Sequence, residues 1–554
     1  MMSVSSESAS SENSGGELRP RVEAWIADET DDELGRASAA ELDTLLSKAS
    51  AGDPAAIAEL ADRFAGPLTF GTAGLRGPLR AGPNGMNSSV VRKAAAGVAA
   101  YLEASGHGAG IVVIGYDGRY GSKAFAEDSA RVFAAAGFNA QLMPRLLPTP
   151  LVAFAVQHVG AVAGVMVTAS HNPPQDNGYK VYADDGAQIV PPMDRDIEAQ
   201  IRAVTSARTV PLSDEYEVFD ESIVQEYIAA VAALVQPDSP RDLRIVHTAM
   251  HGVGSSVVRA VFDAAGFSSP IEVAEQAEPN PDFPTVAFPN PEEPGAMDLA
   301  LALAQNADAD LIIANDPDAD RCAVGARFAG GWRMLRGDEV GVLLADWLIS
   351  HDVRGTYATT IVSSTLLSAM AAKHGLGFAE TLTGFKWISR AAPDLVYGYE
   401  EALGYAVAPD LVRDKDGISA ALLIAELAAT LKSEGSSLPQ RLAEIAAEYG
   451  LYATSQLSWR VDDVTLIGNA MARVRTNPPQ SLLGRAVTVT DLAPENDVMI
   501  LRFDHGRVVV RPSGTEPKCK AYLELVIATD GNADAIAQTE LAALSAEVTA
   551  ALGF

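Results

Sequence analysis

The stretch that shows the fold class most clearly covers residues 111–173. It begins with IVVIGYDGRY (111–120), an apolar run that enters a polar loop, and continues with AFAEDSARVFAAAG (124–137), which has helical periodicity. The run AGVMVTASHNP (163–173) then repeats the pattern of strand followed by loop. Apolar runs that alternate with helices are typical of βαβ units on a mostly parallel sheet. The sequence therefore predicts an α/β domain here.

The same alternation returns further along the chain. Residues 243–266 and 357–375 each have the pattern strand, loop and helix, and residues 311–321 have strand followed by loop. The last part differs, because four strand-like runs between residues 486 and 528 precede one helical run at 532–552. We therefore expect three similar α/β domains with mostly parallel mixed sheets, and a C-terminal α+β domain.

The N-terminal part differs from the rest in composition. Its first residues are rich in Ser, Glu and Gly, which favours a flexible tail, and residues 24–64 show helical periodicity that predicts two or three short helices. We expect the following division: tail 1–22, α/β domain I 23–205, α/β domain II 206–328, α/β domain III 329–445 and α+β domain IV 446–554.

Charge and cysteine content restrict the partners. The 554 residues include 41 Lys and Arg against 72 Asp and Glu, a net charge of −31, so we expect neither nucleic acid nor an anionic membrane surface as a partner. Two cysteines cannot form a disulfide framework, which favours a reducing compartment. With no apolar leader or membrane-length run, we expect a cytoplasmic protein.

The first candidate site is TASHNPP (168–174), with Lys180 close behind. Ser170 follows an apolar strand and precedes Pro-Pro, so it lies on a stiff loop. The G-x-S-x-G elbow of hydrolases is absent, and the adjacent His171 does not make a hydrolase triad by adjacency alone. The alternative is an ordinary turn that closes the strand.

The second candidate site is the acidic segment that follows the apolar strand LIIAN. In an extended segment alternate side chains share a face, so Asp316, Asp318 and Asp320 converge. Converging carboxylates repel one another unless a divalent cation lies between them, and oxygen ligands suit Mg²⁺. An EF-hand is excluded because Arg321 stands where the loop needs Gly. The alternative is a solvated acidic turn.

Two further segments carry groups that suit a phosphorylated sugar. RPSGTEPK (511–518) offers Arg, hydroxyls, Gly and Lys on a tight turn, which suits a phosphate, although a surface hairpin is the alternative. YEEALGY (399–405) offers carboxylates as acceptors for sugar hydroxyls, although it could be a solvated acidic loop. Lys386 and Lys415 add cations nearby in sequence.

These four motifs, in this order, resemble the α-D-phosphohexomutase superfamily, which includes phosphoglucomutases and phosphomannomutases. The resemblance covers residues 68–554, and FGTAGLRG (70–77) is similar to the family's opening motif. The resemblance implies three similar α/β domains and a C-terminal α+β domain around one central cleft, and these are the domains expected above. The sugar loop reads Glu400-Glu401-Ala402, where many phosphoglucomutases have Ser third, and its surroundings look most like the phosphoglucomutase-2-like and phosphopentomutase branch.

The resemblance implies roles for individual residues. Ser170 is the serine that carries the phosphoryl group, and it completes a Mg²⁺ shell with Asp316, Asp318 and Asp320. The implied catalytic group is Ser170, His171, Lys180, Arg76, Arg321 and Lys415. The implied substrate-binding group is Glu400, Lys386, Arg511, Ser513, Gly514 and Thr515.

The resemblance also implies an activity, an isomerase of the phosphotransferase type. We expect interconversion of glucose 1-phosphate and glucose 6-phosphate, with one Mg²⁺ per site and a sugar bisphosphate as primer. Mannose 1-phosphate and ribose 1-phosphate are alternative substrates, and glucose-1,6-bisphosphate synthesis is a further alternative. The expected partner is a small phosphosugar, and the chain is expected to be a monomer or homodimer.

Overall fold

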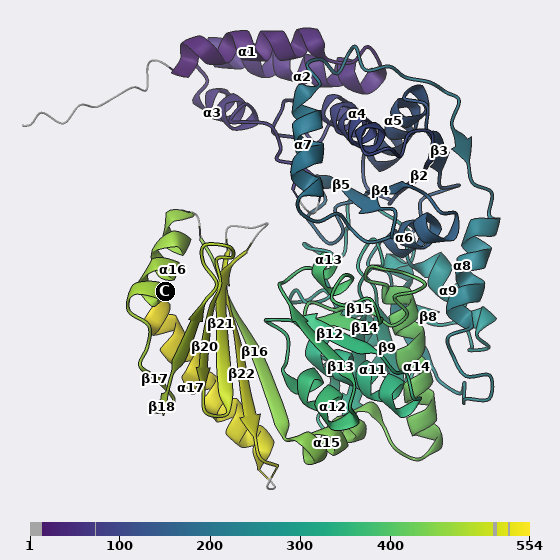
Figure 1. The fold of residues 1–554 in the computed structure, drawn as a ribbon, viewed down its shortest axis with the longest axis vertical. Helices are drawn as coiled ribbons and strands as arrows, with labels where there is room; N and C mark the ends of the chain where they lie inside the picture. The colour runs from purple at the N-terminus through teal and green to yellow at the C-terminus, as the bar shows by residue number, and fades with distance from the viewer. Residues whose placement is uncertain (1–13, 72–73, 462, 514–517, 530–531) are drawn as a thin grey trace, which may run out of the picture. The chain divides into compact units, whose positions relative to one another are not determined.

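Mixed β-sheets flanked by helices form the framework of the chain (Figure 1). The structure is a computed structural model that describes residues 14–71, 74–461, 463–513, 518–529 and 532–554. The chain divides into two units. The first unit lies within residues 1–236, 244–322 and 410–422, and the second within residues 237–243, 323–409 and 423–554.

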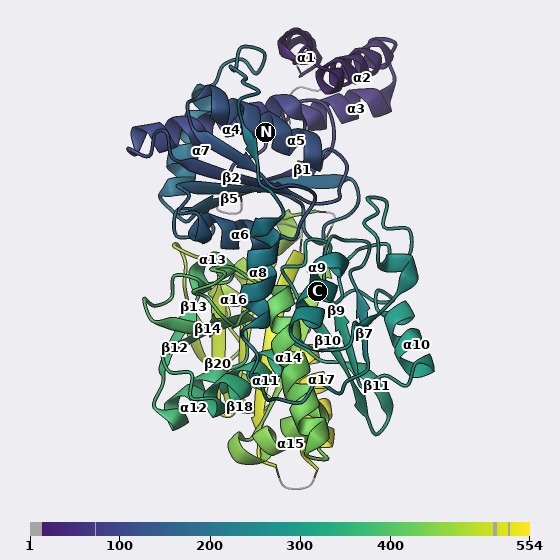
Figure 2. The ribbon, with the colours of Figure 1, turned by 90° about the vertical axis from the view of Figure 1, so that its right-hand side faces the viewer.

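The first unit contains a six-stranded sheet in the order β1-β5-β4-β2-β3-β6. Its strands are β1 (Leu75–Pro78), β2 (Ile111–Tyr116), β3 (Asn139–Leu142), β4 (Ala163–Val167), β5 (Asp176–Ala183) and β6 (Glu217–Val218). Its helices are α4 (Ser88–Ala104), α5 (Ser122–Ala135), α6 (Thr149–His158) and α7 (Met193–Ala203). Helices α4, α5 and α7 lie on one face and α6 on the other (Figures 1 and 2), as predicted for βαβ units.

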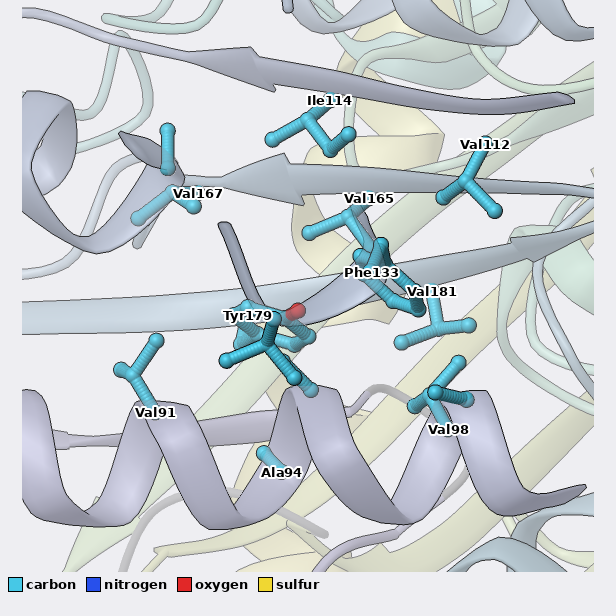
Figure 3. Close-up of a cluster of buried hydrophobic side chains, with 14 of the residues drawn as sticks. Val91, Ala94, Val98, Val112, Ile114, Phe133, Val165, Val167, Tyr179 and Val181 are labelled. Carbon is cyan, nitrogen blue, oxygen red and sulfur yellow. The ribbon is translucent and has the colours of Figure 1, made fainter. Parts of the chain in front are cut away.

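The core of this domain lies between the sheet and α4 and α5. Val91 and Val98 of α4 point toward the sheet that carries Ile114 on β2 and Val165 on β4 (Figure 3), and all four are at most 1% exposed. Burial of each such side chain contributes roughly 1.5–3 kcal/mol. This packing fixes the ends of β4 and β5, which carry the candidate site.

Three helices precede this domain: α1 (Ser14–Asp28), α2 (Glu33–Ser50) and α3 (Pro54–Arg63). Asp32 and Asp53 cap α2 and α3 by accepting backbone N–H groups. The tail predicted over residues 1–22 is wrong for its last part, because α1 begins at Ser14. Val22 of α1 packs on Leu42 and Leu60, so apolar burial orders this segment.

The rest of the first unit contains three parallel strands, with β7 (Ile245–Thr248) between β8 (Ile271–Glu272) and β9 (Leu311–Ala314). The associated helices are α8 (Ser222–Ala232), α9 (Ser255–Ala264), the 3₁₀ helix η1 (Ala274–Gln276) and α10 (Asp298–Asn306). The alternation predicted over residues 243–266 and 311–321 is therefore observed.

The second unit contains a four-stranded sheet in the order β13-β12-β14-β15. Its strands are β12 (Thr356–Thr360), β13 (Gly377–Thr381), β14 (Leu395–Glu400) and β15 (Gly404–Ala406). The unit also contains the antiparallel hairpin of β10 (Ala323–Phe328) and β11 (Gly331–Met334). The neighbouring helices are α11 (Gly337–Ser350), α12 (Leu366–His374), α13 (Phe385–Ile388) and α15 (Leu438–Tyr449).

The C-terminal sheet, also in the second unit, is antiparallel in the order β16-β22-β21-β20-β19. Its strands are β16 (Leu451–Arg460), β19 (Thr488–Asp491), β20 (Met499–Phe503), β21 (Gly506–Pro512) and β22 (Lys518–Ile527), with a short pair β17 (Ser481–Leu482) and β18 (Arg485–Ala486). Helices α16 (Thr465–Thr476) and α17 (Ala533–Leu552) cover one face (Figure 1).

Residues of β20 alternate between the two faces of this sheet. Met499 and Leu501 pack with the cluster that includes α16 and α17, whereas Ile500 packs with Ile361 and Val362, which follow β12. The four-domain α/β architecture with mixed sheets is therefore confirmed, with β16 as a fifth strand that the sequence did not reveal. Among the described residues, no helix has the length and apolarity needed to cross a membrane.

Candidate active site

Ser170 lies in a buried loop that joins β4 to β5. It is 4% exposed, and its φ of 52° is a left-handed conformation that is uncommon for a residue with a side chain. Its N–H donates to Oγ1 of Thr168 at 2.8 Å. Such a conformation persists only where the surroundings hold it. The loop therefore presents Ser170 in a fixed position.

Arg119 is the group that holds this loop most directly. Its Nη2 donates to the carbonyls of Ser170 and Asn172 at 2.6 and 2.5 Å. Its Nη1 donates to the carbonyls of Pro173 and Asp176 at 2.8 and 3.1 Å. Four hydrogen bonds from one buried guanidinium set the path of the loop from the serine to the start of β5.

The acidic loop follows β9. Asp316, Asp318 and Asp320 are at most 1% exposed, and one carboxylate oxygen from each lies within 4.8 Å of the others. The convergence was predicted, but its cause differs from the extended segment expected. Ala319 donates its N–H to the carbonyl of Asp316 at 2.8 Å and has a φ of 53°, so a tight turn brings the carboxylates together.

This donor set fits a divalent cation. Oδ1 of Asp318 and Oδ1 of Asp320 are buried and have no hydrogen-bond partner among the described residues. Buried carboxylates are costly unless a cation or donor compensates them, and an all-oxygen set suits Mg²⁺. The aspartate cluster could therefore hold the predicted metal, with Asp316, Asp318 and Asp320 as its ligands.

Cations surround the same loop. Nζ of Lys180, on β5, lies 2.8 Å from Oδ2 of Asp318 and 2.9 Å from Oδ2 of Asp320. Nζ of Lys415 lies 3.1 Å from that Asp320 oxygen. Nε of Arg321 lies 3.8 Å from the other Asp320 oxygen, Oδ1. Three cations therefore face three carboxylates in a buried space, so the positive charges offset the carboxylates that burial would otherwise destabilise.

Ser170 lies at the edge of this cluster. Its Oγ donates to Oδ2 of Asp316 at 2.8 Å and lies 3.1 Å from Nδ1 of His171. Burial, with the charges of Arg321 and Arg76, holds the pKa of His171 well below its ordinary value. The ring is therefore neutral near pH 7.

The carboxylates of the cluster differ in acidity. Burial and the charges of Asp318 and Asp320 raise the pKa of Asp316 well above its ordinary value. Burial also acts on Asp318, but the charge and hydrogen bond of Lys180 outweigh it and lower the pKa of that carboxyl. In return, Asp318 and Asp320 raise the pKa of Lys180 against the effect of burial. Lys180 is therefore held as an ammonium.

Arg76 reaches the site from β1, which pairs with β5. Its Nη1 donates to Oδ1 of Asn172 in the serine loop at 3.0 Å. The charge of Arg76 also acts on His171, as described above. Arg76 therefore belongs to the same cluster as Ser170, as predicted.

Acidic neighbours position Lys415 at the start of α14 (Gly417–Ser433). Asp414 accepts the Lys415 N–H at 2.8 Å and the hydroxyl of Tyr182 at 2.9 Å. Asp416 accepts the N–H groups of Ile418 and Ser419 at 3.0 and 3.2 Å, which caps the helix. Both contacts fix the backbone on either side of the lysine.

The predicted sugar-binding residues lie in the second unit. Glu400 ends β14 and is 9% exposed, and Lys386 lies on α13 with Nζ 5.6 Å from the ring centroid of Trp387. The neighbouring Glu401 is engaged within the fold: Oγ of Ser363 accepts its N–H and donates to its Oε2, both at 3.1 Å. Glu401 is therefore bound within the fold, and the role of Glu400 in binding a substrate stays a prediction.

The predicted phosphate loop follows β21. Arg511 lies in that strand, and the N–H of Ser513 donates to the carbonyl of Lys518, the first residue of β22, at 2.8 Å. The predicted residues Gly514 and Thr515 lie outside the described residues. The tight phosphate-binding loop expected from the sequence therefore stays a prediction.

Some residues at the site were not predicted. Arg119 was missed, and so was Thr149, whose Oγ1 donates to Oδ2 of Asp318 at 2.7 Å. A signal existed for Arg119, because it lies in the polar loop after β2, at the same sheet edge as the loop after β4. Thr149 begins a helix, and nothing in its local pattern indicates a ligand contact.

Models of one protein family match most of the chain. The phosphoglucomutase/phosphomannomutase α/β/α domains I, II and III match residues 67–208, 225–327 and 336–449, and the C-terminal domain matches residues 470–542.

Comparison with individual proteins points to the same family. A Haemophilus influenzae protein named "Probable phosphomannomutase" is 46% identical over 456 residues, which cover 79% of this chain and 93% of that protein. A phosphopentomutase of Mus musculus is 37% identical over 544 residues, 86% of each chain. The crystal structure of the Paramecium phosphoglucomutase parafusin, at 20% identity, has a TM-score of 0.70 over 87% of this chain and 95% of that one, which shows the shared fold. Because all four domain models match in order and the identity to relatives is this high, the chain belongs to the phosphoglucomutase/phosphomannomutase family and is a phosphotransferase mutase, an isomerase.

Proposed function

We propose that this enzyme interconverts glucose 1-phosphate and glucose 6-phosphate through a phosphorylated Ser170 and a bisphosphorylated sugar. The observation that carries the proposal is the position of the Ser170 hydroxyl, 2.8 Å from Asp316 at the edge of a cluster of buried carboxylates and cations. A serine so placed has a ring of charges for a transferring phosphoryl group, which is what this chemistry requires of a protein.

The proposed transfer exchanges one bond for another. The bond between Oγ of Ser170 and phosphorus breaks as a bond forms from phosphorus to the free hydroxyl of the sugar monophosphate. The hydroxyl proton goes to a base, for which neutral His171 is suited, since Lys180 is held as an ammonium. Lys415 remains the other candidate. The sugar bisphosphate then returns its other phosphoryl group to Ser170, and the same residue serves as the acid.

Mg²⁺ held by Asp316, Asp318 and Asp320 would supply Lewis-acid stabilisation of charge on the phosphoryl group. Lys180 and Arg321 serve the same purpose with fixed positive charge, and Arg76 keeps the serine loop in place through Asn172. In the second unit, Glu400 is proposed to bind sugar hydroxyls. The residues proposed for the phosphate that does not react are Lys386, Arg511, Ser513, Gly514 and Thr515.

The identity of the sugar is the open element of the proposal. Relatives of this chain are named for mannose and pentose phosphates, so phosphomannomutase and phosphopentomutase activities are the alternatives. One panel separates them: glucose 1-phosphate, mannose 1-phosphate and ribose 1-phosphate, each with Mg²⁺ and a trace of the matching bisphosphate. We expect the highest kcat/KM with glucose 1-phosphate, and a higher value for another sugar would replace the substrate assignment.

A second measurement tests the chemistry itself. Phosphopeptide mass spectrometry should find phosphate on Ser170, and Ser170→Ala should lose nearly all turnover. Ser433→Ala, a change at an exposed serine at the end of α14, is the control that should stay fully active. Quantitative isomerisation without release of inorganic phosphate separates a mutase from a phosphatase, while net bisphosphate accumulation would indicate a bisphosphate synthase. A Ser170→Ala protein with near wild-type turnover would refute the phosphoserine.

A further inference from the structure

A buried polar pair lies behind the aspartate loop, and no step above uses it. His247, on β7, and Asn315, directly after β9, are both fully buried. Nε2 of His247 lies 3.0 Å from Oδ1 of Asn315. Neither residue touches the aspartates through its side chain in the described contacts, yet Asn315 immediately precedes Asp316.

The hydrogen bond from Asn315 to Arg321 shows which group is the donor between His247 and Asn315. Its Nδ2 donates to the backbone carbonyl of Arg321 at 2.7 Å. Because a carbonyl only accepts, the amide nitrogen must face Arg321, and Oδ1 must face the imidazole. Nε2 of His247 therefore carries a proton and donates it to Asn315.

The other ring nitrogen is also held. Nδ1 of His247 lies 3.0 Å from Oε2 of Glu272, its register partner on β8. Ser255 donates its hydroxyl to the same carboxylate oxygen at 3.1 Å. With both nitrogens in contact, the ring cannot turn without breaking a buried hydrogen bond.

The Asn315–Arg321 hydrogen bond joins the two ends of the aspartate loop. Asn315 is the residue before Asp316 and Arg321 the residue after Asp320, so this bond closes the loop at its base. The backbone of Gly417 packs on the same joint: a Cβ there would lie 2.2 Å from the Arg321 carbonyl and 2.8 Å from Nδ2 of Asn315. The segment that carries Lys415 therefore rests on this bond as well.

We propose that His247 is a positioning residue for the metal site: by orienting Asn315 it closes the loop and sets the separation of Asp316, Asp318 and Asp320. The inference rests on the proposed function in one respect, that these aspartates bind Mg²⁺. Groups one step removed from metal ligands change metal affinity by roughly 10- to 100-fold, and we expect a loss in this range when the donor to Asn315 is removed.

Two substitutions separate the two sides of the ring. In His247→Gln the amide nitrogen approximates Nε2 and keeps the donor to Asn315, whereas in His247→Asn it approximates Nδ1 and keeps the donor to Glu272. If His247 only stabilised the fold, His247→Gln would be the more damaging change, because it leaves the Glu272 carboxylate without its ring partner. If His247 instead positions Asn315, His247→Asn should weaken Mg²⁺ binding more than His247→Gln does.

The test is isothermal titration calorimetry of Mg²⁺ into the full-length protein with Ser170 unphosphorylated, as verified by intact mass. We expect His247→Gln to bind Mg²⁺ within about threefold of wild type and His247→Asn to bind at least about tenfold more weakly. Ser255→Ala, which removes a hydrogen bond to Glu272 but leaves Asn315 untouched, should bind as wild type. Thermal unfolding of each variant measures stability separately.

Equal Mg²⁺ affinity for wild type and His247→Asn would overturn the inference. The inference would also fail if the variants lost Mg²⁺ affinity in the same order in which their unfolding temperatures fall. Failure of the metal site itself gives a different result, because wild type would then show no Mg²⁺ binding heat. If His247→Asn fails to fold, loss of affinity in His247→Gln of more than about tenfold contradicts the proposal by itself.

Discussion

Asp338 is a buried acid that should make the stability of the second unit depend on pH. It lies in the first turn of α11, accepts the Ser364 N–H at 2.7 Å and accepts the hydroxyl of Tyr399 at 3.2 Å. Burial, with the charges of Glu401 and Glu524, raises the pKa of Asp338 from 3.8 to about 7. The folded chain therefore binds a proton near neutral pH that the unfolded chain has released.

The sign and size of the effect follow from this difference. The contribution of Asp338 to the free energy of unfolding is greatest at low pH. It falls as pH rises through 7, because ionising this carboxyl costs more in the folded state than in the unfolded state. Between pH 6 and pH 8 the loss is about 1.4 kcal/mol. For a domain of this size that corresponds to a decrease of about 3–6 °C in Tm.

The substitution Asp338→Asn tests this directly, because an amide oxygen keeps both acceptor contacts but does not ionise. Thermal unfolding of wild type and variant should be followed at pH 6, 7 and 8. We expect the variant to lose the part of the pH dependence that belongs to this group. Asp242→Asn, with a fully exposed side chain in the same unit, is the control and should unfold with the wild-type slope. An Asp338→Asn slope equal to that of wild type would refute the reasoning.

Three further substitutions test other parts of the structure. Arg119→Met removes four hydrogen bonds to the serine loop and should lower kcat/KM by ~100-fold, whereas Arg131→Met at a partly exposed arginine should not; equal rates would contradict the clamp. Asp318→Asn should weaken Mg²⁺ binding by more than about tenfold in calorimetry, and unchanged affinity would remove Asp318 from the ligand set. Arg507→Met leaves the buried Glu524 without its cation and should cost about 3 kcal/mol in chemical unfolding; a loss below about 1 kcal/mol would show that the pair is dispensable.

The sequence predicted features that depend on short-range patterns. The run LIIAN predicted a buried strand and the following acids predicted a converging loop, and both are observed in β9 and at Asp316, Asp318 and Asp320. The turn that brings the three carboxylates together could not be predicted. It depends on a left-handed backbone conformation at Ala319, and an alanine in the sequence does not indicate that conformation.

Features that depend on distant partners were missed. The strand β16 was not recognised because its side chains alternate irregularly between exposed and half-buried, and its position is set by pairing with β22 about 70 residues later. Arg119 and His247 were missed for the same reason: Ser170 lies 51 residues after Arg119, and Asn315 lies 68 residues after His247. Helix α1 was hidden by glycines and by Pro20, and it forms because Val22 finds an apolar partner in α2.

The net charge of −31 and a phosphorylated substrate are compatible because charge is unevenly distributed. Three of the acids are fully buried and face each other, so they contribute to the count but not to the outer surface. The cations Lys180, Lys415 and Arg321 lie within 4 Å of these acids, in a space where water screens little and each charge acts strongly on a small anion. A small phosphorylated substrate would interact with these local charges rather than with the net charge of the chain. A divalent cation on the aspartates would turn the sum of the cluster positive, which makes metal binding and phosphate binding mutually reinforcing at this site.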